Sequence, residues 1–183
     1  MASARGTEIG KTTGTTVTPK SRMNNPAMIV PEAMAPLQSL GQLLGALQGP
    51  PARALALAML RTSQLNGCAN CLTASCWQLK QQGESDERLM AVSAWRESDA
   101  FTAPERAALA LAESMTRLSD RSDPVPDAVW EEAAGHFGER ELAFLVLGIA
   151  TENLYNRVNV ATRQGRPEWD ANAAKEWAAR TKA

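Results

Sequence analysis

Apolar residues recur every three or four positions along most of the chain, which is the spacing of a helix with one buried face. In the first such segment, from Pro31 to Leu47, the recurring residues are Met34, Leu37, Leu40, Leu43, Leu44 and Leu47. No segment shows the apolar and polar alternation between turn signals that is typical of hairpin strands. The pattern therefore predicts an all-α fold.

Helix stop and start signals divide the first half of the chain. Gly49-Pro50-Pro51 is predicted to stop the first helix, and a core helix follows from Ala52. Asn66-Gly67 tolerates the left-handed conformation of a helix end, so the next helix is expected to begin at about Cys68. That helix should run to Gly83, and Ser85 should cap the following one.

Similar signals mark the second half. Thr102 and Glu105 have the spacing of a capping box, in which each side chain accepts a backbone N–H hydrogen bond at the start of a helix. Val125-Pro126-Asp127 is predicted to open another helix. Gly138 should separate that helix from a long one that runs from Glu139 to about Arg163.

Length and composition predict one domain with two peripheral ends. A chain of 183 residues fits a single core. Residues 1–22 are rich in Thr and Gly and lack apolar periodicity, so we expect a disordered N-terminal extension there. The domain should cover residues 23–165, and residues 166–183 should form a peripheral C-terminal helix.

Charge and hydropathy limit the partners. The chain has 19 basic and 20 acidic side chains and a net charge of -1. It therefore lacks the excess of positive charge that is typical of proteins that bind nucleic acid. The longest nearly apolar stretch, Leu142 to Ala150, is about half of the roughly 20 residues that cross a bilayer, so no membrane segment is expected. Three cysteines without a secretory segment predict a cytoplasmic protein.

Cys68 and Cys71 are the pair with the most distinctive chemistry. A helix N-terminus favours the thiolate, which is the nucleophilic form of cysteine, and Cys68 lies at a predicted helix start. Cys71 follows about one helical turn later on nearly the same face, close enough for the two sulfurs to form a disulfide. The spacing therefore predicts thiol redox chemistry.

Two other interpretations of the cysteine pair remain open. Free cysteines are often small buried hydrophobes, so the pair could be structural. A closed zinc site needs four ligands, and only Cys76 and His136 remain as further sulfur or imidazole donors. Cys76 should point to another side of the helix and pack in the core, and we expect His136 to be structural. We predict no metal and no cofactor.

The residues around the pair resemble a known family. The segment from Leu60 to Cys71, LRTSQLNGCANC, is similar to the signature of the carboxymuconolactone decarboxylase and alkylhydroperoxidase D (AhpD)-like family. Further matching segments are GESDERL from Gly83, SAWRE from Ser93, FT from Phe101, ERAALA from Glu105 and IATENLYNR from Ile149. The resemblance as a whole covers roughly Asn24 to Gln164.

The resemblance implies an all-helical, AhpD-like bundle that assembles as a homo-oligomer, a trimer or a hexamer. It also implies reduction of hydroperoxides: Cys71 attacks the peroxide, Cys68 resolves the product into a disulfide, and a thiol or lipoyl-type reductant restores the pair. The expected catalytic residues are thus Cys68 and Cys71.

Two positions depart from the family pattern. The family's relay histidine falls at Ser75, whose hydroxyl cannot act as a base near neutral pH, and its relay glutamate falls at Ala56. We therefore expect attenuated peroxidase activity. Without an imidazole beside Cys71, the helix start should make Cys68 the thiol with the lower pKa. Glu113 and Glu152 are candidate substitute carboxylates.

Two alternative functions keep the fold. One is a cofactor-free decarboxylase or cyclase-type enzyme that acts on a small organic acid without using the thiols. The other is a non-catalytic oligomeric binding protein, consistent with the absent relay. Four aromatic residues are candidates to line a ligand pocket, although we expect them to pack in the core or at subunit contacts: Trp77, Trp95, Trp130 and Tyr155.

Overall fold

The computed structural model describes residues 20–165, and every regular element in that range is a helix. In chain order the elements are α1 (Pro26–Ile29), η1 (Pro31–Ala33), α2 (Met34–Gly45), α3 (Gly49–Asn66), α4 (Ala69–Gln81), α5 (Asp86–Ala91), η2 (Val92–Ala94), α6 (Ala103–Thr116), α7 (Asp127–His136) and α8 (Glu139–Thr162). Residues 1–19 and 166–183, which hold most of the predicted extension and the predicted C-terminal helix, lie outside the described residues. The domain bounds stay a prediction.

The capping signals of the sequence are confirmed. Gly67 ends α3 with a φ of 64°, in the left-handed region that glycine tolerates best. The Ser85 side chain accepts a hydrogen bond from the backbone N–H of Arg88 at the start of α5. Thr102 and Glu105 form the capping box of α6. These local bonds fix where each helix begins.

Two boundary predictions were wrong. The segment from Pro31 to Leu47 is a short 3-10 helix followed by α2, rather than one helix. Gly49-Pro50-Pro51 does not merely stop a helix, because these residues form the first turn of α3 after the extended N-cap Gln48. Prolines are tolerated there since first-turn amides have no carbonyl partner within the helix.

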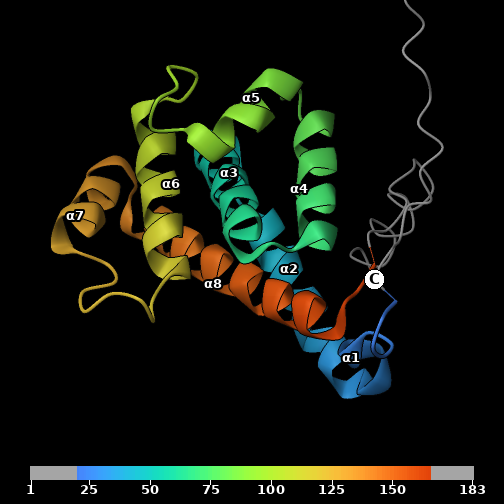
Figure 1. Ribbon diagram of the computed structural model, residues 1–183. Helices are drawn as coiled ribbons and strands as arrows, with labels where there is room; N and C mark the ends of the chain where they lie inside the picture. The colour runs from blue at the N-terminus through green and yellow to red at the C-terminus, as the bar shows by residue number, and fades with distance from the viewer. Residues whose placement is uncertain (1–19, 166–183) are drawn as a thin grey trace, which may run out of the picture.

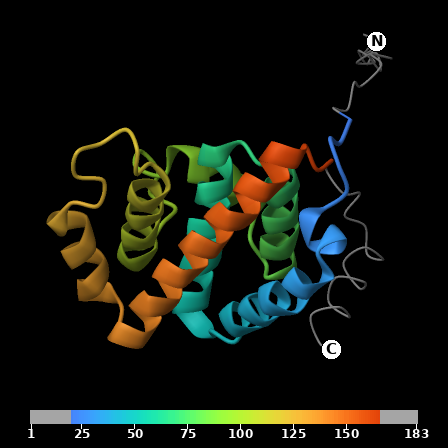
Figure 2. The ribbon, with the colours of Figure 1, turned by 90° about the horizontal axis from the view of Figure 1, so that it is seen from below.

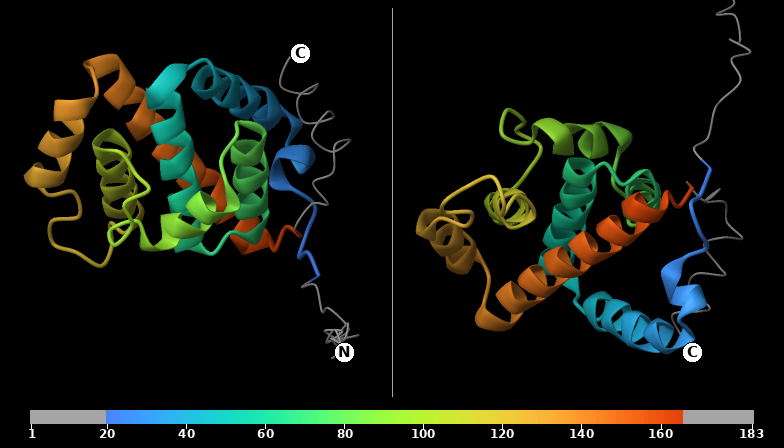
Figure 3. Two further views of the ribbon diagram at one scale, coloured as in Figure 1. Left: turned by 90° about the horizontal axis from the view of Figure 1, so that it is seen from above. Right: turned by 60° about the horizontal axis from the view of Figure 1, so that its bottom comes forward.

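α3 lies at the centre of the bundle. Figure 1 shows α6 on one side of α3 and α4 on the other, with α5 above them and α7 outside α6. The long helix α8 runs diagonally across α3, as the view from below shows (Figure 2). Figure 3 shows the same crossing from a second direction, with α2 beyond the N-terminal end of α3. The end of α3 and the start of α4 therefore lie against the second half of α8.

Buried apolar side chains form two clusters on either side of α3. The first joins α3 to α6, α7 and α8 through residues that include Leu55, Leu111, Leu145 and Ile149. The second joins α3 to α4, α5 and α6 through residues that include Leu57, Leu60, Leu79 and Leu109. Burial of such side chains is the main stabilising contribution to a helical bundle.

The crossing of α3 and α8 depends on a glycine. A Cβ atom at Gly148 would overlap the Cδ1 atom of Leu55, a side chain that is itself buried in the first cluster. The two helices thus approach as closely as a hydrogen atom at Gly148 allows. This close contact sets the position of the later turns of α8 relative to α3.

None of the helices within residues 20–165 is both long enough and apolar enough to cross a membrane. The long apolar stretch of the sequence, Leu142 to Ala150, lies inside α8 and contributes to the first core cluster.

Candidate active site

The cysteine pair lies at the junction of α3 and α4. Gly67 ends α3, and Cys68 is the N-cap residue of α4, as the sequence predicts. The backbone N–H of Cys68 donates to the carbonyl of Ser63, and the Cys68 sulfur accepts a 3.3 Å hydrogen bond from the backbone N–H of Cys71. The turn therefore holds one sulfur against the unpaired amides of a helix start.

The two sulfurs are joined. Cys68 and Cys71 form a disulfide across a Cα–Cα distance of 5.4 Å, within the range that disulfides ordinarily span. Cys68 is 1% exposed and Cys71 is 8% exposed. The pair is thus a short-range disulfide in which Cys71 is the half nearer to solvent.

Four polar residues of α8 face this junction. We call Glu152, Asn153, Asn156 and Asn159 the α8 polar row. The first three are buried. The Nδ2 amide of Asn159 donates a 3.3 Å hydrogen bond to the Cys71 sulfur. One end of the row therefore contacts a sulfur of the candidate site.

The rest of the row is tied to the end of α3. The Asn66 amide donates to the side-chain oxygens of both Asn153 and Asn156, at 3.0 and 2.9 Å. The Ser63 hydroxyl donates a 2.6 Å hydrogen bond to Oε1 of Glu152, which also accepts one from Asn156 at 2.7 Å. These bonds satisfy polar groups that would be costly to bury alone.

Glu152 is a buried carboxyl group with an altered acidity. Burial raises the pKa of the Glu152 carboxyl above its ordinary value, and the hydrogen bonds from Ser63 and Asn156 offset only part of that effect. Glu152 precedes Asn159 by seven residues, or about 10 Å along the helix axis. The structure thus places a group able to hold a proton two turns of α8 away from the contact with sulfur.

Comparisons with known proteins show the family to which the chain belongs. The model of the carboxymuconolactone decarboxylase family matches residues 31–114, which include both cysteines. YdfG of Bacillus subtilis, an uncharacterized protein, is 34% identical over 105 residues, which are 57% of this chain and 70% of YdfG. The uncharacterized protein YnjA of Escherichia coli is 33% identical over 57% of this chain, but that match covers only 56% of YnjA.

A solved structure decides the assignment. ATU0492 of Agrobacterium tumefaciens, described as a protein of unknown function and a candidate antioxidant defence protein AhpD, superposes with a TM-score of 0.73 at 30% identity, over 81% of this chain and 99% of its own. The chain belongs to the carboxymuconolactone decarboxylase family. The debrominase Bmp8 shares the fold alone, with a TM-score of 0.67 at 20% identity over 77% of this chain and 74% of Bmp8.

The two positions at which the family resemblance predicts relay residues lie on the two helices that the cysteine turn joins. Ala56 lies in α3, half-buried at the edge of the second core cluster. Ser75 lies in α4, one turn after Cys71, and is also half-buried. An alanine and a serine thus stand where the resemblance places a carboxylate and an imidazole, and neither can carry a proton near neutral pH.

Glu113, the other candidate carboxylate, belongs to a different cluster. Its side chain accepts hydrogen bonds from Arg61, from Arg96 and from the Trp95 indole. Burial raises the pKa of the Glu113 carboxyl, but these donors outweigh burial and leave that pKa below its ordinary value. Glu113 is therefore held as a carboxylate by two guanidinium groups and is not free to take up a proton.

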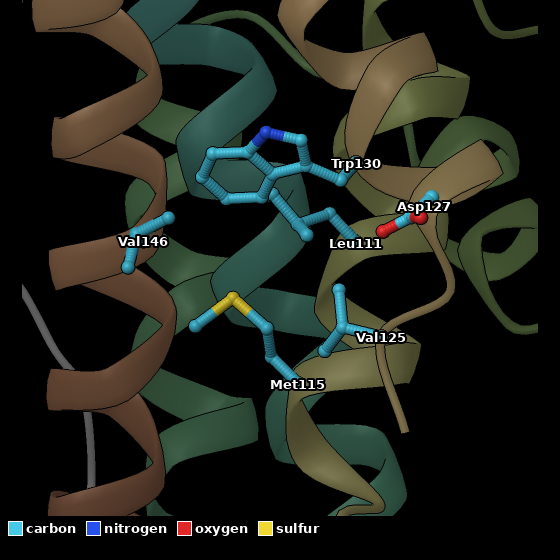
Figure 4. Close-up of a pocket in the computed structure, with 6 residues that line it drawn as sticks. All are labelled: Leu111, Met115, Val125, Asp127, Trp130 and Val146. Carbon is cyan, nitrogen blue, oxygen red and sulfur yellow. The ribbon is translucent and has the colours of Figure 1, made fainter. Parts of the chain in front are cut away.

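The aromatic residues divide between core and surface. Trp95 is buried, and the Tyr155 hydroxyl donates to the carbonyl of Leu37. Trp130 is 44% exposed, so it does not pack in the core of the chain, and its place at a subunit contact stays a prediction. It lines an open cavity of about 380 Å³ between α6, α7 and α8, together with Leu111, Met115, Val125, Asp127 and Val146 (Figure 4).

The Trp130 cavity is separate from the cysteine pair. Val146, which lines it, and Asn159, which contacts Cys71, are 13 residues apart on α8, or about 20 Å along the axis. His136 ends α7, and its Nε2 lies 3.2 Å from Glu132 of the same helix. Cys76 is half-buried against the second cluster, and burial raises the pKa of its thiol.

Sequence reasoning missed Asn159 and the partners of Glu152. Ser63, Asn66, Asn153 and Asn156 lie inside the segments that resemble the family, yet no role followed from them. A usable signal is present: Glu152, Asn156 and Asn159 follow one another at four- and three-residue steps, so they share one face of a helix that is otherwise largely apolar. Buried polar residues in that register need partners on the facing helix.

Proposed function

We propose that the protein is a thiol-dependent oxidoreductase of the alkylhydroperoxidase type that reduces hydroperoxides with the Cys68–Cys71 pair. The observation that carries the proposal is the disulfide between these two residues at the start of α4, in a chain of a family whose match includes both. A structural pair of unlinked buried thiols, the first alternative, does not require the two sulfurs to meet.

The proposed reaction has two steps on the enzyme. The thiolate of Cys71 attacks the distal oxygen of a hydroperoxide, which breaks the O–O bond, leaves a sulfenic acid on Cys71 and releases the alcohol after protonation. The Cys68 thiol then attacks that sulfur, so that the disulfide forms and water leaves. The greater exposure of Cys71 supports this order of roles.

The cycle closes by thiol–disulfide exchange. A dithiol reductant, a small thiol pair or a lipoyl-type group, attacks the disulfide, passes through a mixed disulfide and leaves as its own disulfide, while both cysteines become thiols again. A nearly buried pair favours a small or extended reductant. Because alanine and serine occupy the predicted relay positions 56 and 75, turnover should be slower than in a protein with a complete relay.

We also propose that the working form is a homo-oligomer, a trimer or a hexamer. The outer face of α8 carries exposed apolar residues that recur at helical spacing: Ala143, Leu147, Ala150, Leu154 and Ala161. We call these five residues the α8 outer stripe. Leu147 is 46% exposed and Leu154 is 41% exposed, and an exposed apolar stripe of this kind is typical of a subunit contact.

The direct test is hydroperoxide consumption with dithiothreitol or dihydrolipoamide as the reductant. The wild type should turn over, Cys68→Ser/Cys71→Ser should not, and Cys76→Ser should keep the wild-type rate because Cys76 lies outside the pair. Equal turnover in the double variant would overturn the proposal. Absence of turnover in the wild type with every dithiol would overturn it too, in favour of a binding protein.

A further inference from the structure

We infer that Asn159 is a catalytic residue of the cysteine pair: its side-chain N–H stabilises the thiolate of Cys71, at a site where no imidazole is present to do so. The inference rests on the proposed function and adds a residue to it. The observation behind it is the hydrogen bond of 3.3 Å from Asn159 Nδ2 to the Cys71 sulfur.

The contact strengthens as the sulfur gains charge. A disulfide sulfur is a weak hydrogen-bond acceptor, whereas a thiolate carries a full negative charge, and hydrogen bonds to charged groups are about twice as strong as those between neutral groups. The same N–H therefore favours the ionised over the neutral thiol of Cys71. A lower pKa follows for that thiol, with more thiolate near neutral pH.

The donor is neutral, which suits a nearly buried sulfur. A buried positive charge would need a counter-charge, whereas a neutral amide needs only hydrogen-bond partners. An amide also differs from a histidine in a way that matters for mechanism: it lowers the pKa of the thiol but cannot take up the proton. Asn159 would thus replace the electrostatic part of the missing relay and leave proton transfer to solvent.

The rest of the α8 polar row explains why Asn159 is held in place. Glu152, Asn153 and Asn156 are tied to Ser63 and Asn66, the residues of α3 that precede the cysteine turn. These bonds fix the register of α8 against the end of α3. One turn beyond them, Asn159 reaches Cys71 at the start of α4, and the turn before Cys71 is tied to α3 by the bond from the Cys68 N–H to the Ser63 carbonyl.

The peroxide step benefits from this donor, because the side-chain N–H stabilises Cys71 as the attacking thiolate. Cys68 receives a different donor, the backbone N–H of Cys71, so the two sulfurs can be tuned independently.

The two donors act on different thiols, so their effects can be measured separately. If the helix start dominates, Cys68 has the lower pKa, as the sequence alone suggests. If the Asn159 amide contributes as inferred, its removal must raise the pKa of Cys71 and leave that of Cys68 nearly unchanged. A measurement on each cysteine separately can therefore isolate Asn159 without any assay of turnover.

The experiment measures the rate of iodoacetamide labelling of the reduced protein between pH 5 and 10, with each cysteine quantified by mass spectrometry. Asn159→Leu removes the donor and keeps the branched shape of the side chain, and Val160→Leu changes the adjacent solvent-facing position as a matched control. We expect Asn159→Leu to raise the apparent pKa of Cys71 by about one unit, which lowers its labelling at pH 7 about tenfold.

Two further variants keep the test decisive. Asn159→Asp replaces the donor with a carboxylate of similar size and should raise the pKa of Cys71 further, because like charges repel. Asn159→Gln retains an amide and should fall between the wild type and the leucine variant. Unfolding curves for each protein show that the fold is retained. An unchanged pKa of Cys71 in both the leucine and aspartate variants would overturn the inference, as would a shift confined to Cys68.

The outcome is separable from that of the proposed function. Absence of peroxidase turnover in the wild type would overturn the proposed function. The labelling experiment would still report whether Asn159 lowers the pKa of Cys71. Conversely, peroxidase turnover in the wild type, together with unchanged labelling of Cys71 in the Asn159 variants, would overturn this inference and leave the proposed function standing.

Discussion

The hydroxyl of Ser63 donates a 2.6 Å hydrogen bond to Oε1 of Glu152, and this bond joins α3 to α8 beside the cysteine pair. Ser63 is also the residue whose backbone carbonyl accepts the N–H of Cys68. One residue thus links the buried carboxyl group to the turn that carries the first cysteine.

Glu152 should make the stability of the protein fall with rising pH. Burial raises the pKa of Glu152 in the folded state above the ordinary 4.5, so the folded protein holds this proton more tightly than the unfolded chain. That contribution is complete below pH 4.5 and is lost as the pH rises through the folded pKa. The slope is at most about 1.4 kcal/mol per pH unit.

Glu152→Gln tests this dependence, because Oε1 accepts both hydrogen bonds and an amide oxygen can keep them. Denaturant unfolding at pH 5 and pH 8 should show the variant gaining stability relative to the wild type as the pH rises. Glu131→Gln, at an exposed position of α7, is the matched control for the loss of one carboxylate. A difference between variant and wild type that is the same at both pH values would contradict the account of Glu152.

Gly148→Ala should destabilise the crossing of α3 and α8. The new methyl group would overlap Leu55, which is buried and must shift together with its neighbours. Overpacking of this kind costs about 1–3 kcal/mol in the free energy of unfolding. Gly135→Ala, in α7, places its methyl group in open space and should instead stabilise the protein by up to about 1 kcal/mol. Thermal and denaturant unfolding of both variants would show whether the signs are opposite.

The oligomer should depend on the α8 outer stripe. Leu147→Glu/Leu154→Glu places two charges on that stripe and should convert the proposed trimer or hexamer into smaller species, since burying unpaired carboxylates at a contact is costly. Sedimentation or light scattering of the purified protein measures the mass directly. Met90→Glu, a similarly exposed apolar position on α5, is the control and should leave the mass unchanged. An assembly unaffected by the double substitution would rule out the outer stripe as the contact.

Restoring the two relay positions should accelerate the reaction. Ser75→His/Ala56→Glu supplies a base and a carboxylate at the two half-buried positions where the family resemblance predicts the relay, and general acid–base assistance typically contributes about 10²- to 10⁴-fold. We expect hydroperoxide turnover at least tenfold above the wild type. Ser75→Gln/Ala56→Gln fills similar volumes without a group that transfers protons, and it should show no gain. A rate no higher than that of the glutamine variant would mean that the positions no longer face the reacting sulfur.

The sequence predicted the helices and the place of the cysteine turn because their signals are local. Gly67, Ser85 and the pair Thr102 and Glu105 each act within one turn of backbone, so their residue types suffice. The prolines at 50 and 51 were misassigned for a related reason: the same residue can end one helix and begin the next.

The contacts of the site could not be predicted in the same way. Asn159 and Cys71 are 88 positions apart, and their hydrogen bond depends on the angle at which α8 crosses α3. Glu113 and Glu152 are two glutamates in predicted helices, yet one is held by arginines and the other by a hydroxyl and an amide. The packing of helices that are distant in sequence therefore decides that Glu113 stays a carboxylate while Glu152 can hold a proton.

The central claim, that the pair exchanges two electrons with a hydroperoxide, is tested most directly by one stoichiometric reaction. The fully reduced protein is mixed with one equivalent of cumene hydroperoxide, alkylated at once and analysed by mass spectrometry. We predict that Cys68 and Cys71 become linked with the loss of two hydrogen atoms, that one equivalent of alcohol appears and that Cys76 remains alkylated. Both cysteines recovered in alkylated form, with the hydroperoxide unconsumed, would contradict the claim.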